Sequence, residues 1–556
     1  MNPSQLEVDD VAPWGTPEPC CALLAHRQHF EKKVHQVTHR VYSAVGYSLG
    51  NCILIVTDAG NVIVDTTESI EAAQEIKAEF DKISPQPVAA VIYTHGHQDH
   101  THGTSVFATN QTPIYAHRKT REFLDQQFNQ LQPILSLRGR RQFGLLLPEN
   151  YVPSSGLGPR LRIDRSRLPI LMPPTDVFDD VRQLEVGGIK MVLQAAPGET
   201  DDQIFIWMPD EKVLLSADNY YPAFPNLYTI RGTAPRPVQQ WIHSLDKMRD
   251  LAPEFLVPSH TQPLYGSHHI VGLLTQYRDA IQYVHDAVIR GANQGKTPDE
   301  LVAEIRLPAH LVNQHELLEL YGKVSESVRA IYDGYLGWFD GNATNLEPLR
   351  QKQRAERIAK LAGGVSSLEA EAKSALHRQD FQWAAEVAEM MLQLSPDDRE
   401  MKLLKAEALF RLGEAAINSN SRSYYFHQAL ELTGQIRVNP VSENARRAYA
   451  QAMSIHQFCT NMPVWLNPLT SAAVTICANV HVVDVDQSFI VNVRLGVAEV
   501  RSGTQASPDI TVRVRAQDWK DLILRVQNAE SLVTEGRVAL VGESLLFEQL
   551  VTMFQE

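Results

Sequence analysis

The motif His-Gly-His-Gln-Asp-His at residues 95–100 constrains the fold of this chain more than any other feature. It directly follows the apolar run Val-Ala-Ala-Val-Ile-Tyr, which predicts a buried strand. The imidazoles and the carboxylate therefore lie at the C-terminal end of a strand, where α/β folds place their sites. Nitrogen and carboxylate donors suit a cation such as zinc. We expect His95 and His97 to bind one ion, and Asp99 and His100 to turn to a second.

Three further metal-capable side chains follow at later points of the chain. Glu199 stands in Ala-Pro-Gly-Glu-Thr, Asp218 ends Val-Leu-Leu-Ser-Ala-Asp, and His260 ends Phe-Leu-Val-Pro-Ser-His. Together with the motif at 95–100, this order of residues resembles the ligand pattern of the metallo-β-lactamase superfamily. The resemblance implies two ligand sets joined by a bridging carboxylate: His95, His97 and Glu199; Asp99, His100 and His260; and Asp218 as the bridge.

Three features narrow the resemblance to the alkylsulfatase branch of that superfamily. Position 199 carries glutamate where the wider superfamily has histidine, as in that branch. The segment Asn-Leu-Tyr-Thr-Ile-Arg-Gly resembles a branch segment whose arginine, here Arg231, binds sulfate, and Arg236 is a second candidate for the anion. The string Tyr-Leu-Gly-Trp-Phe-Asp-Gly-Asn at 335–342 closely resembles the dimerisation segment of the same enzymes. The resemblance covers residues 35–345 well and the remainder in outline.

The resemblance implies a binuclear zinc hydrolase that cleaves alkyl sulfate esters to an alcohol and inorganic sulfate, and that forms a homodimer. Two zinc ions per chain would hold a hydroxide whose pKa is brought toward neutrality. Asp99 would orient that hydroxide or receive a proton from it. Arg231 would bind two sulfate oxygens, because a planar guanidinium matches them better than an ammonium does. The expected substrate is a small alkyl sulfate with an apolar tail.

Two other functions remain open. Asp218 stands where alkylsulfatases often have glutamate, and Phe-Gly-Leu, ending at Leu145, stands where relatives have the polar Tyr-Gly-Asn. Both differences leave open the alternative that the same metal site hydrolyses a phosphodiester, a lactone or a thioester. A lipid-binding protein with a degenerate site is the other alternative, and the complete ligand set argues against it. The metal bound per chain separates the enzyme hypotheses from the lipid carrier.

Sequence patterns divide the chain into four parts. Alternating strand and helix patterns predict a layered α/β domain, followed by a helical and then an α+β region. The family resemblance implies that these are an αββα metallo-β-lactamase sandwich, an all-helical dimerisation domain and a domain that resembles sterol carrier protein 2 (SCP2-like). The predicted bounds are 1–34 for an N-terminal extension, 35–266 for the catalytic domain, 267–465 for the helical domain and 466–556 for the SCP2-like domain.

Several shorter patterns predict individual elements. Residues 51–56 and 61–65 predict a hairpin, and residues 69–83 an amphipathic helix. Helical spacing continues over 267–290 and 317–339, where clustered aromatic side chains indicate core or dimer contacts. The arginine- and proline-rich stretch 120–175 is too long for an ordinary connection and predicts an insertion over the site.

Composition and charge exclude several classes of protein. The net charge of −14 over 556 residues disfavours nucleic acid as a partner, because phosphate backbones demand basic surface. No apolar run approaches the roughly 20 residues of a membrane span. Five scattered cysteines argue against a disulfide framework. The first ten residues lack the basic and apolar regions of a secretory signal, so we expect a cytoplasmic protein, or a periplasmic one if a signal has been removed.

Overall fold

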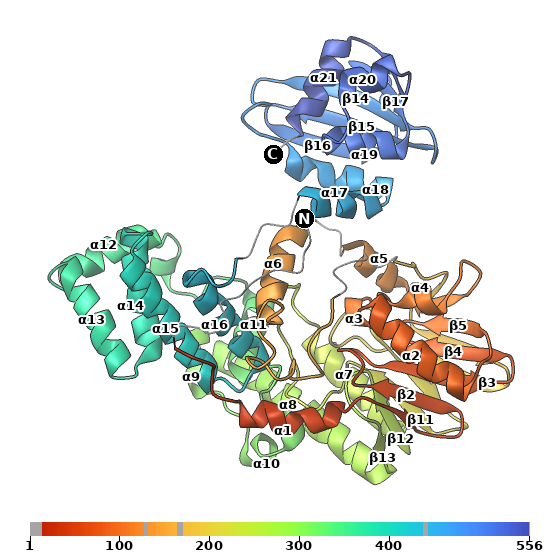
Figure 1. Cartoon of the computed structure of the whole chain (residues 1–556), viewed down its shortest axis with the longest axis vertical. Helices are drawn as coiled ribbons and strands as arrows, with labels where there is room; N and C mark the ends of the chain where they lie inside the picture. Colours follow the sequence, from red (N-terminus) through yellow and green to blue (C-terminus); the bar gives the residue numbers. More distant parts are fainter. Residues whose placement is uncertain (1–13, 127–129, 164–170, 438–442, 555–556) are drawn as a thin grey trace. The chain divides into compact units, whose positions relative to one another are not determined.

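The computed structural model describes residues 14–126, 130–163, 171–437 and 443–554. The chain forms two compact units, Met1–Leu124 with Leu135–Val438, and Asp125–Ile134 with Asn439–Glu556 (Figure 1). The expectation about a secretory signal concerns the first ten residues, which lie outside the described ranges. None of the helices in the described ranges combines the length and apolar character needed to cross a membrane.

Two sheets form the centre of the first unit. The first sheet has the order β1-β2-β3-β4-β5-β6-β7, with strands Lys33–Gln36, Val41–Val45, Cys52–Thr57, Gly60–Val64, Val88–Ile92, Ile114–His117 and Asp176–Phe178. The second has the order β13-β12-β11-β10-β9-β8, with strands Leu264–Tyr265, Phe255–Pro258, Val213–Ala217, Ile204–Met208, Ile189–Ala195 and Val181–Val186. The antiparallel pairing of β3 with β4 confirms the predicted hairpin.

Alternating side chains along the strands explain the layers. In β4, Val62 and Val64 join the core between the two sheets, whereas Ile63 packs on the other face with helix α2 (Ile70–Ile83). Ser69 caps this helix by accepting a hydrogen bond from the Ala72 amide, which confirms the predicted amphipathic helix.

The second sheet is covered in the same way on its outer face. Leu214 of β11 and Leu256 of β12 pack with Trp241 of α7 (Val238–Asp250) and Leu274 of α8 (Ser267–Asn293). Helices therefore cover both outer faces of the paired sheets, and the αββα sandwich is confirmed.

Parallel strand pairs position the candidate site. β4 pairs with β5, and β11 pairs with β12, each pair in parallel. Their C-terminal ends carry the predicted ligands, since the 95–100 motif follows β5 and Asp218 follows β11. Short helices follow two strands of the first sheet along the chain. After β5 come α3 (Gln98–Thr101) and α4 (Thr104–Phe107), and after β6 come α5 (Arg118–Gln126) and α6 (Gln132–Gln142).

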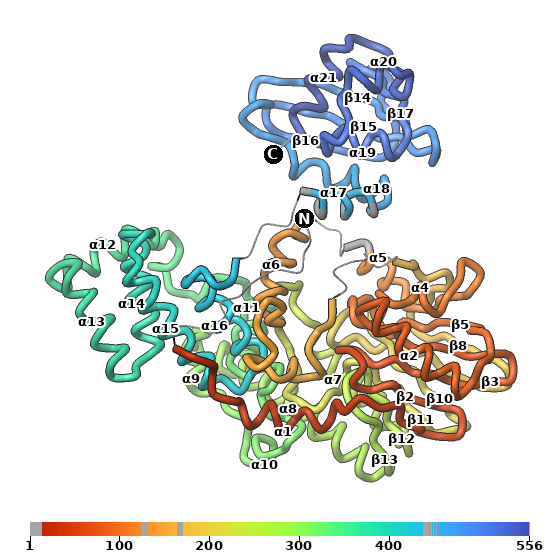
Figure 2. Tube along the Cα trace, in the orientation of Figure 1, coloured from red at the N-terminus to blue at the C-terminus, as the bar shows by residue number. Residues whose placement is uncertain are grey.

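A helical region follows the sandwich within the first unit. Its elements after α8 are α9 (Pro298–Glu304), α10 (Ala309–Val312), η2 (His315–Leu317), α11 (Val324–Leu336), η3 (Ala343–Asn345), α12 (Gln351–Leu361), α13 (Val365–His377), α14 (Phe381–Leu394), α15 (Arg399–Ala415) and α16 (Ser419–Leu432). In Figure 2, α13 to α16 stack in sequence order, each against the next.

The predicted helix 317–339 is wrong in its first part, because α11 begins only at Val324. Between Leu318 and Gly322 the backbone instead pairs with a loop of the sandwich. The Phe224 amide donates to the Leu318 carbonyl at 2.8 Å, and the Gly322 amide donates to the Phe224 carbonyl at 3.0 Å. A Cβ at Gly322 would lie 2.1 Å from the Pro225 carbonyl oxygen, so this close approach requires glycine.

The second unit is an α+β domain, as predicted. Its sheet has the order β16-β15-β14-β17-β18, with strands Val497–Ser502, Gln487–Arg494, Thr475–Val482, Ile510–Val514 and Val538–Val541. Its helices are α17 (Glu443–Ala452), α18 (Ile455–Asn461), η4 (Met462–Trp465), α19 (Ala516–Ile523), α20 (Ala529–Thr534) and α21 (Ser544–Met553).

The helix α18 belongs to the core of this second unit. Phe458 and Met462 pack with the sheet residues Val480 and Val491 and with Trp519 of α19. The predicted helical domain extends to residue 465 and therefore includes α18 wrongly, because period-3.6 patterns alone do not show which core a helix contacts.

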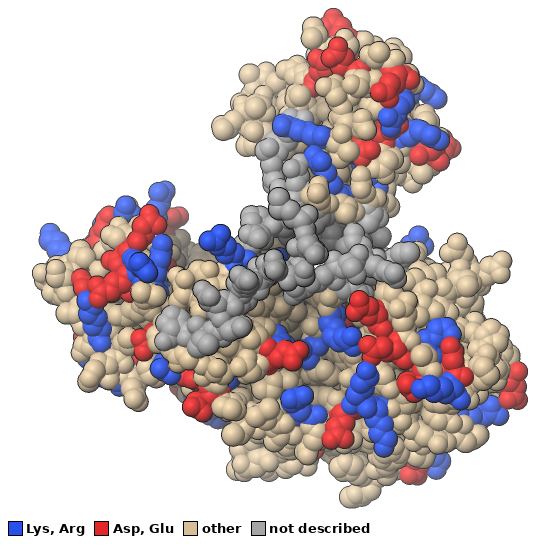
Figure 3. All heavy atoms as spheres, in the orientation of Figure 1, with Lys and Arg blue, Asp and Glu red and all other residues tan. Residues whose placement is uncertain are grey.

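Charged side chains of both signs are interspersed over the face of the molecule that Figure 3 shows. On the face that Figure 3 shows, Lys and Arg alternate with Asp and Glu over both units. This mixed pattern is that of an ordinary protein surface and differs from the basic footprint of a nucleic-acid-binding protein.

Candidate metal centre

The structure brings six of the seven predicted ligands together. Two groups each place three ligand atoms within 4.8 Å of one another. The groups are His95, His97 and Asp218, and Asp99, His100 and His260. The grouping follows from topology, since these residues lie at the C-terminal ends of β5, β11 and β12.

Asp218 lies between the two groups. Its Oδ2 is 3.0 Å from His260 Nε2, 3.5 Å from His100 Nε2 and 3.7 Å from His95 Nε2. One carboxylate oxygen thus faces imidazoles of both groups, which is the position of a bridging ligand. The preceding Ala217 has φ of 53°, a left-handed conformation that a non-glycine residue adopts at a cost in free energy.

The separations of the donor atoms fit a divalent metal ion. Ligand atoms about 2.1 Å from a tetrahedral ion lie about 3.4 Å from one another. Asp99 Oδ2 is 3.5 Å from both His100 Nε2 and His260 Nε2. His100 Nε2 and Asp218 Oδ1 are buried and have no hydrogen-bond partner among the described residues. Buried polar atoms left in this way are costly unless a cation binds them.

A second layer of hydrogen bonds orients the imidazoles. His100 Nδ1 donates to Asp65 Oδ2 at 2.8 Å, and the hydroxyls of Thr94 and Ser259 donate to the same oxygen at 2.7 and 3.2 Å. His260 Nδ1 donates to the Leu49 carbonyl oxygen at 2.9 Å. Both imidazoles therefore keep Nε2 as the atom available to a metal.

Asp65 is a functional residue that the sequence analysis missed. It ends the run Val-Ile-Val-Asp of β4, and the same reasoning that selected the motif after β5 could have selected it. Its φ of 56° turns the chain where the strand ends.

Glu199 is not gathered with the other predicted ligands. Its Oε1 forms an ion pair of 2.9 Å with Arg236 Nη2, and both side chains are almost fully buried. Its Oε2 is buried without a hydrogen-bond partner among the described residues. Burial raises the pKa of Glu199, and the charge of Arg236 opposes that rise. One oxygen thus remains available for a metal while the other holds Arg236.

Arg231 lies beside the first ligand group. Its Nη2 is 3.2 Å from His97 Nε2, and its Nη1 donates to Thr229 Oγ1 at 2.8 Å. The Gln142 side chain accepts hydrogen bonds from the Arg231 amide and the Thr229 hydroxyl, which fixes this segment. A guanidinium at the edge of the metal site can bind an anion placed over it.

The pKa shifts of the histidines have opposite directions in the two ligand groups. Burial lowers the pKa of His260, but Asp218 and Asp99 outweigh that effect and raise it to about 9. The same competition raises the pKa of His100 well above its ordinary value. For His97, burial, His95 and Arg231 all act in one direction and lower the pKa well below its ordinary value. The second group therefore carries the carboxylate charge that a cation can replace.

Comparison with known proteins identifies the family. Residues 45–260 match the model of the metallo-beta-lactamase superfamily, residues 297–435 that of alkyl sulfatase dimerisation and residues 443–556 that of the alkyl sulfatase C-terminal domain. A linear primary-alkylsulfatase of Pseudomonas sp. (strain ATCC 19151) is 34% identical over 508 residues, which cover 88% of this chain and 94% of that protein. The chain belongs to the alkylsulfatase family of the metallo-β-lactamase superfamily.

Other alkylsulfatases extend this comparison. The alkyl/aryl-sulfatase BDS1 of Saccharomyces cerevisiae is 26% identical over 532 residues, covering 94% of this chain and 82% of that protein. The solved structure of the stereoselective inverting sec-alkylsulfatase Pisa1 from Pseudomonas sp. has a TM-score of 0.89 at 24% identity. It covers 96% of this chain and 86% of that one, so the fold is shared over nearly the whole chain.

The side chains at the end of α11 lie partly in the core and partly on the surface of this alkylsulfatase-family chain. Tyr332 is buried in the core that α8 and α11 form, whereas Tyr335, Leu336 and Trp338 are 53, 56 and 73% exposed. The segment thus presents apolar side chains to solvent within the region that matches the dimerisation model.

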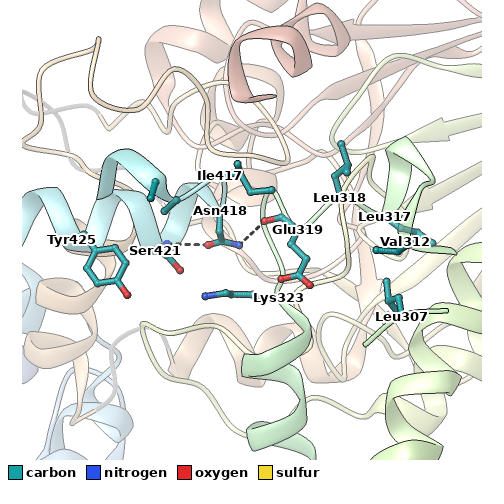
Figure 4. A pocket seen from close by; sticks show the side chains of 12 residues that line it. Leu307, Val312, Leu317, Leu318, Glu319, Lys323, Ile417, Asn418, Ser421 and Tyr425 are labelled. Atoms are coloured by element: carbon teal, nitrogen blue, oxygen red, sulfur yellow. Dashed lines mark hydrogen bonds between the residues drawn. The ribbon is translucent and has the colours of Figure 1, made fainter. Parts of the chain in front are cut away.

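A separate pocket of about 400 Å³ lies in the helical region and contains none of the predicted site residues. Leu307, Leu317, Ile417 and Tyr425 contribute to its lining (Figure 4). The Asn418 side chain donates to the Glu319 carbonyl at its edge. Because no metal-capable group of the catalytic motif reaches it, this pocket does not displace the metal centre as the candidate site.

Proposed function

We propose that this chain is a binuclear zinc hydrolase that cleaves alkyl sulfate esters to an alcohol and inorganic sulfate. The observation that carries the proposal is the pair of adjacent ligand groups with Asp218 between them and the guanidinium of Arg231 beside His97. Membership of the alkylsulfatase family supports the substrate class, because the curated relatives are named for alkyl sulfate esters.

Two zinc ions fit the donor set better than softer metals would, since every donor is an imidazole nitrogen or a carboxylate oxygen. We assign His95, His97 and Glu199 to one ion, Asp99, His100 and His260 to the other, and Asp218 to both. When bound, the ions supply Lewis acidity, which stabilises negative charge and makes water more acidic.

Asp99 is our candidate for moving the proton. Its side chain is 15% exposed, whereas those of Asp218 and His100 are 2% and 0% exposed, so water and substrate reach it most readily. Burial opposes its ionisation, but His100 and His260 outweigh that effect and lower its pKa. Asp99 therefore stays ionised, and it orients the attacking water and accepts a hydrogen bond from it.

The two arginines bind the sulfate group in this proposal. Arg231 is half-buried and held by Thr229, so its planar fork is preorganised for two anion oxygens. Arg236 is a secondary candidate, because its Nη groups bind Glu199 and the Asn226 carbonyl while its Nε has no hydrogen-bond partner among the described residues. The negative net charge of the chain makes this local positive charge necessary.

We further propose a homodimer built on the exposed side chains Tyr335, Leu336 and Trp338. The match of residues 297–435 to an alkyl sulfatase dimerisation model supports this assembly. We keep 1–34 and 35–266, followed by a helical part from 267, as a proposal about the functional parts. Because α18 packs in the core of the second unit, we propose that the last, SCP2-like part begins with α17 and not at 466.

A sulfate-release assay tests the proposal. Primary and secondary alkyl sulfates are offered to the full chain alongside a phosphodiester, a thioester and a lactone. We expect inorganic sulfate from the alkyl sulfates at a rate far above hydrolysis of the other esters. Faster turnover of a phosphodiester, thioester or lactone would reassign the substrate, and a chain without bound metal would indicate the lipid-carrier alternative.

A further inference from the structure

A second cluster of histidines lies outside the metal centre. His26 ends α1 (Cys21–His26), His29 lies in η1 (Arg27–Phe30), and His315 begins η2. One ring nitrogen of each lies within 4.8 Å of one nitrogen of the others. The ring centroids are 5.1 Å apart for His26 and His29, 4.9 Å for His29 and His315, and 5.4 Å for His26 and His315.

The hydrogen bond of His26 to Gly156 uses one ring nitrogen and leaves the lone pair of the other nitrogen free. Its Nε2 lies 2.8 Å from the Gly156 carbonyl oxygen, which can only accept, so Nε2 carries the proton. Nδ1 is then unprotonated, and it is buried without a hydrogen-bond partner among the described residues. A backbone carbonyl behind one ring nitrogen, with the other nitrogen free, is the usual arrangement of a metal-ligating histidine.

His29 shows the same shortage of partners. Its Nε2 is also buried and has no hydrogen-bond partner among the described residues. Each buried imidazole nitrogen without a partner destabilises the folded chain. Apolar side chains in these positions would avoid that cost, so packing alone does not account for three histidines here.

The protonation state agrees with ligand chemistry. Burial, with smaller contributions from His29 and His315, lowers the pKa of His26 to about 3. Burial also lowers the pKa of His29, and the Glu316 carboxylate opposes that shift. The neutral imidazole is the form that binds a metal, and a nearby carboxylate partly compensates the charge of a cation.

We propose that His26, His29 and His315 form a third metal site, which binds a zinc-class divalent ion and has a structural role. Three imidazole nitrogens are a donor set for zinc, and Irving–Williams competitors such as copper fit the same donors. The site is distinct from the catalytic pair, because none of its ligands belongs to either catalytic group.

The position of the site defines its role. His315 begins the segment that leads to Leu318 and Tyr321, and Leu318 is hydrogen-bonded to the Phe224 loop. Tyr321 is buried against Tyr221, with ring centroids 5.7 Å apart, and the Tyr221 ring lies 6.4 Å from that of His260. An ion at the three histidines would tie the segment before β1 to the loop that carries Tyr321 toward the catalytic centre.

Metal analysis of matched variants tests the site. His315 is half-buried, so His315→Asn removes one ligand with little change in packing, and the exposed His310 on α10 provides the control His310→Asn. After zinc loading and dialysis against metal-free buffer, we expect about one zinc per chain less in His315→Asn than in the parent chain, and no loss in His310→Asn. Equal zinc in a folded His315→Asn and the parent chain would overturn the proposal.

Two further measurements separate this proposal from the catalytic one. His97→Ala should lose catalytic zinc yet keep the ion whose loss follows His315→Asn, so the double variant should lose both. If the chain bound no catalytic zinc, the difference in bound zinc between the parent chain and His315→Asn would still be about one ion per chain, so the two proposals can fail separately. Anomalous scattering at the zinc edge from crystals of the unmodified, zinc-loaded chain should show a peak among the three rings, and no peak there would refute the site even if His315→Asn failed to fold.

Discussion

The chain contains two clusters of buried imidazoles that differ in the charge around them. At the catalytic centre, Asp218 and Asp99 raise the pKa of His260 to about 9 against the effect of burial. At the cluster of His26, His29 and His315, burial prevails and lowers the pKa of His26 to about 3. His100 and His260 are more deeply buried than His29 and His315, so the carboxylates that face the catalytic histidines raise their pKa against a stronger effect of burial.

The comparison assigns different chemistry to the two clusters. Carboxylates that face several imidazoles supply the negative charge that two adjacent divalent ions require, and an exposed edge at Asp99 admits substrate. Three imidazoles without a carboxylate ligand suit a single ion. This difference supports the two proposals, a reactive metal pair at the first cluster and an ion that joins two segments of chain at the His26 cluster.

His97→Ala should break the catalytic cluster and leave the other intact. We expect alkyl sulfate hydrolysis to fall by about ten-thousandfold or more, because a binuclear centre needs both ions. Zinc per chain should fall in the same sample, as measured by atomic emission. Activity close to that of the parent chain after this loss of zinc would show that the first ligand group is not catalytic.

Acid stability should reveal the other cluster. A histidine whose pKa is lowered on folding stabilises the native state above the unfolded pKa of about 6.5 and loses that contribution as the pH falls toward 3. In metal-free protein, the pH-dependent loss between pH 7 and 4.5 should be smaller in His26→Gln, which keeps a donor for Gly156, by about 2–3 kcal/mol. Urea unfolding at both pH values measures the free energy of unfolding of each protein. An equal loss of this free energy in the parent chain and in His26→Gln would contradict the lowered pKa of His26.

Asp65→Asn should weaken the catalytic cluster without removing a ligand. The carboxylate that orients His100 would be lost, which typically costs about 10–100-fold in metal affinity. Competition with a chromogenic chelator measures this affinity, and Asp58→Asn at the turn of the same hairpin is the control. Unchanged zinc affinity in Asp65→Asn would show that Asp65 is not needed to orient the imidazole.

Arg231→Lys should produce the smallest of these effects and the most selective one. Lysine keeps the charge but loses the bidentate fork, so we expect kcat/KM for alkyl sulfates to fall about tenfold, or about 1.4 kcal/mol. Zinc content and hydrolysis of an uncharged lactone should change little, and Arg182→Lys on the surface strand β8 serves as the control. An equal loss on both substrates would remove the sulfate-binding role from Arg231.

Much of the fold was predictable because it rests on periodic patterns and strand-end motifs. The apolar runs before His95 and in β4 predicted buried strands, and the resemblance to the metallo-β-lactamase superfamily supplied the sandwich. The start of α11 was predicted too early, because the pairing of residues 318–322 with Phe224 is a tertiary contact with no local signature. The placement of α18 is limited in the same way, because its apolar face does not indicate that it packs against the C-terminal sheet.

The site was predictable where a ligand belongs to a motif and less so elsewhere. Glu199 was selected as a ligand, but its pairing with Arg236 depends on two loops that meet only in the folded chain. The cluster of His26, His29 and His315 was not predicted, because its members come from distant segments and follow no spacing rule. Strand-end position was available as a signal for Asp65 and was not used.

Zinc reconstitution tests the central claim most directly. The full chain is stripped with a chelator, assayed for sulfate release from a linear alkyl sulfate, and assayed again after zinc is restored, with bound zinc measured in each sample. The account predicts that release is lost with the metal and returns with zinc in the parent chain, but not in His97→Ala. Undiminished sulfate release by protein that contains no bound metal would contradict it.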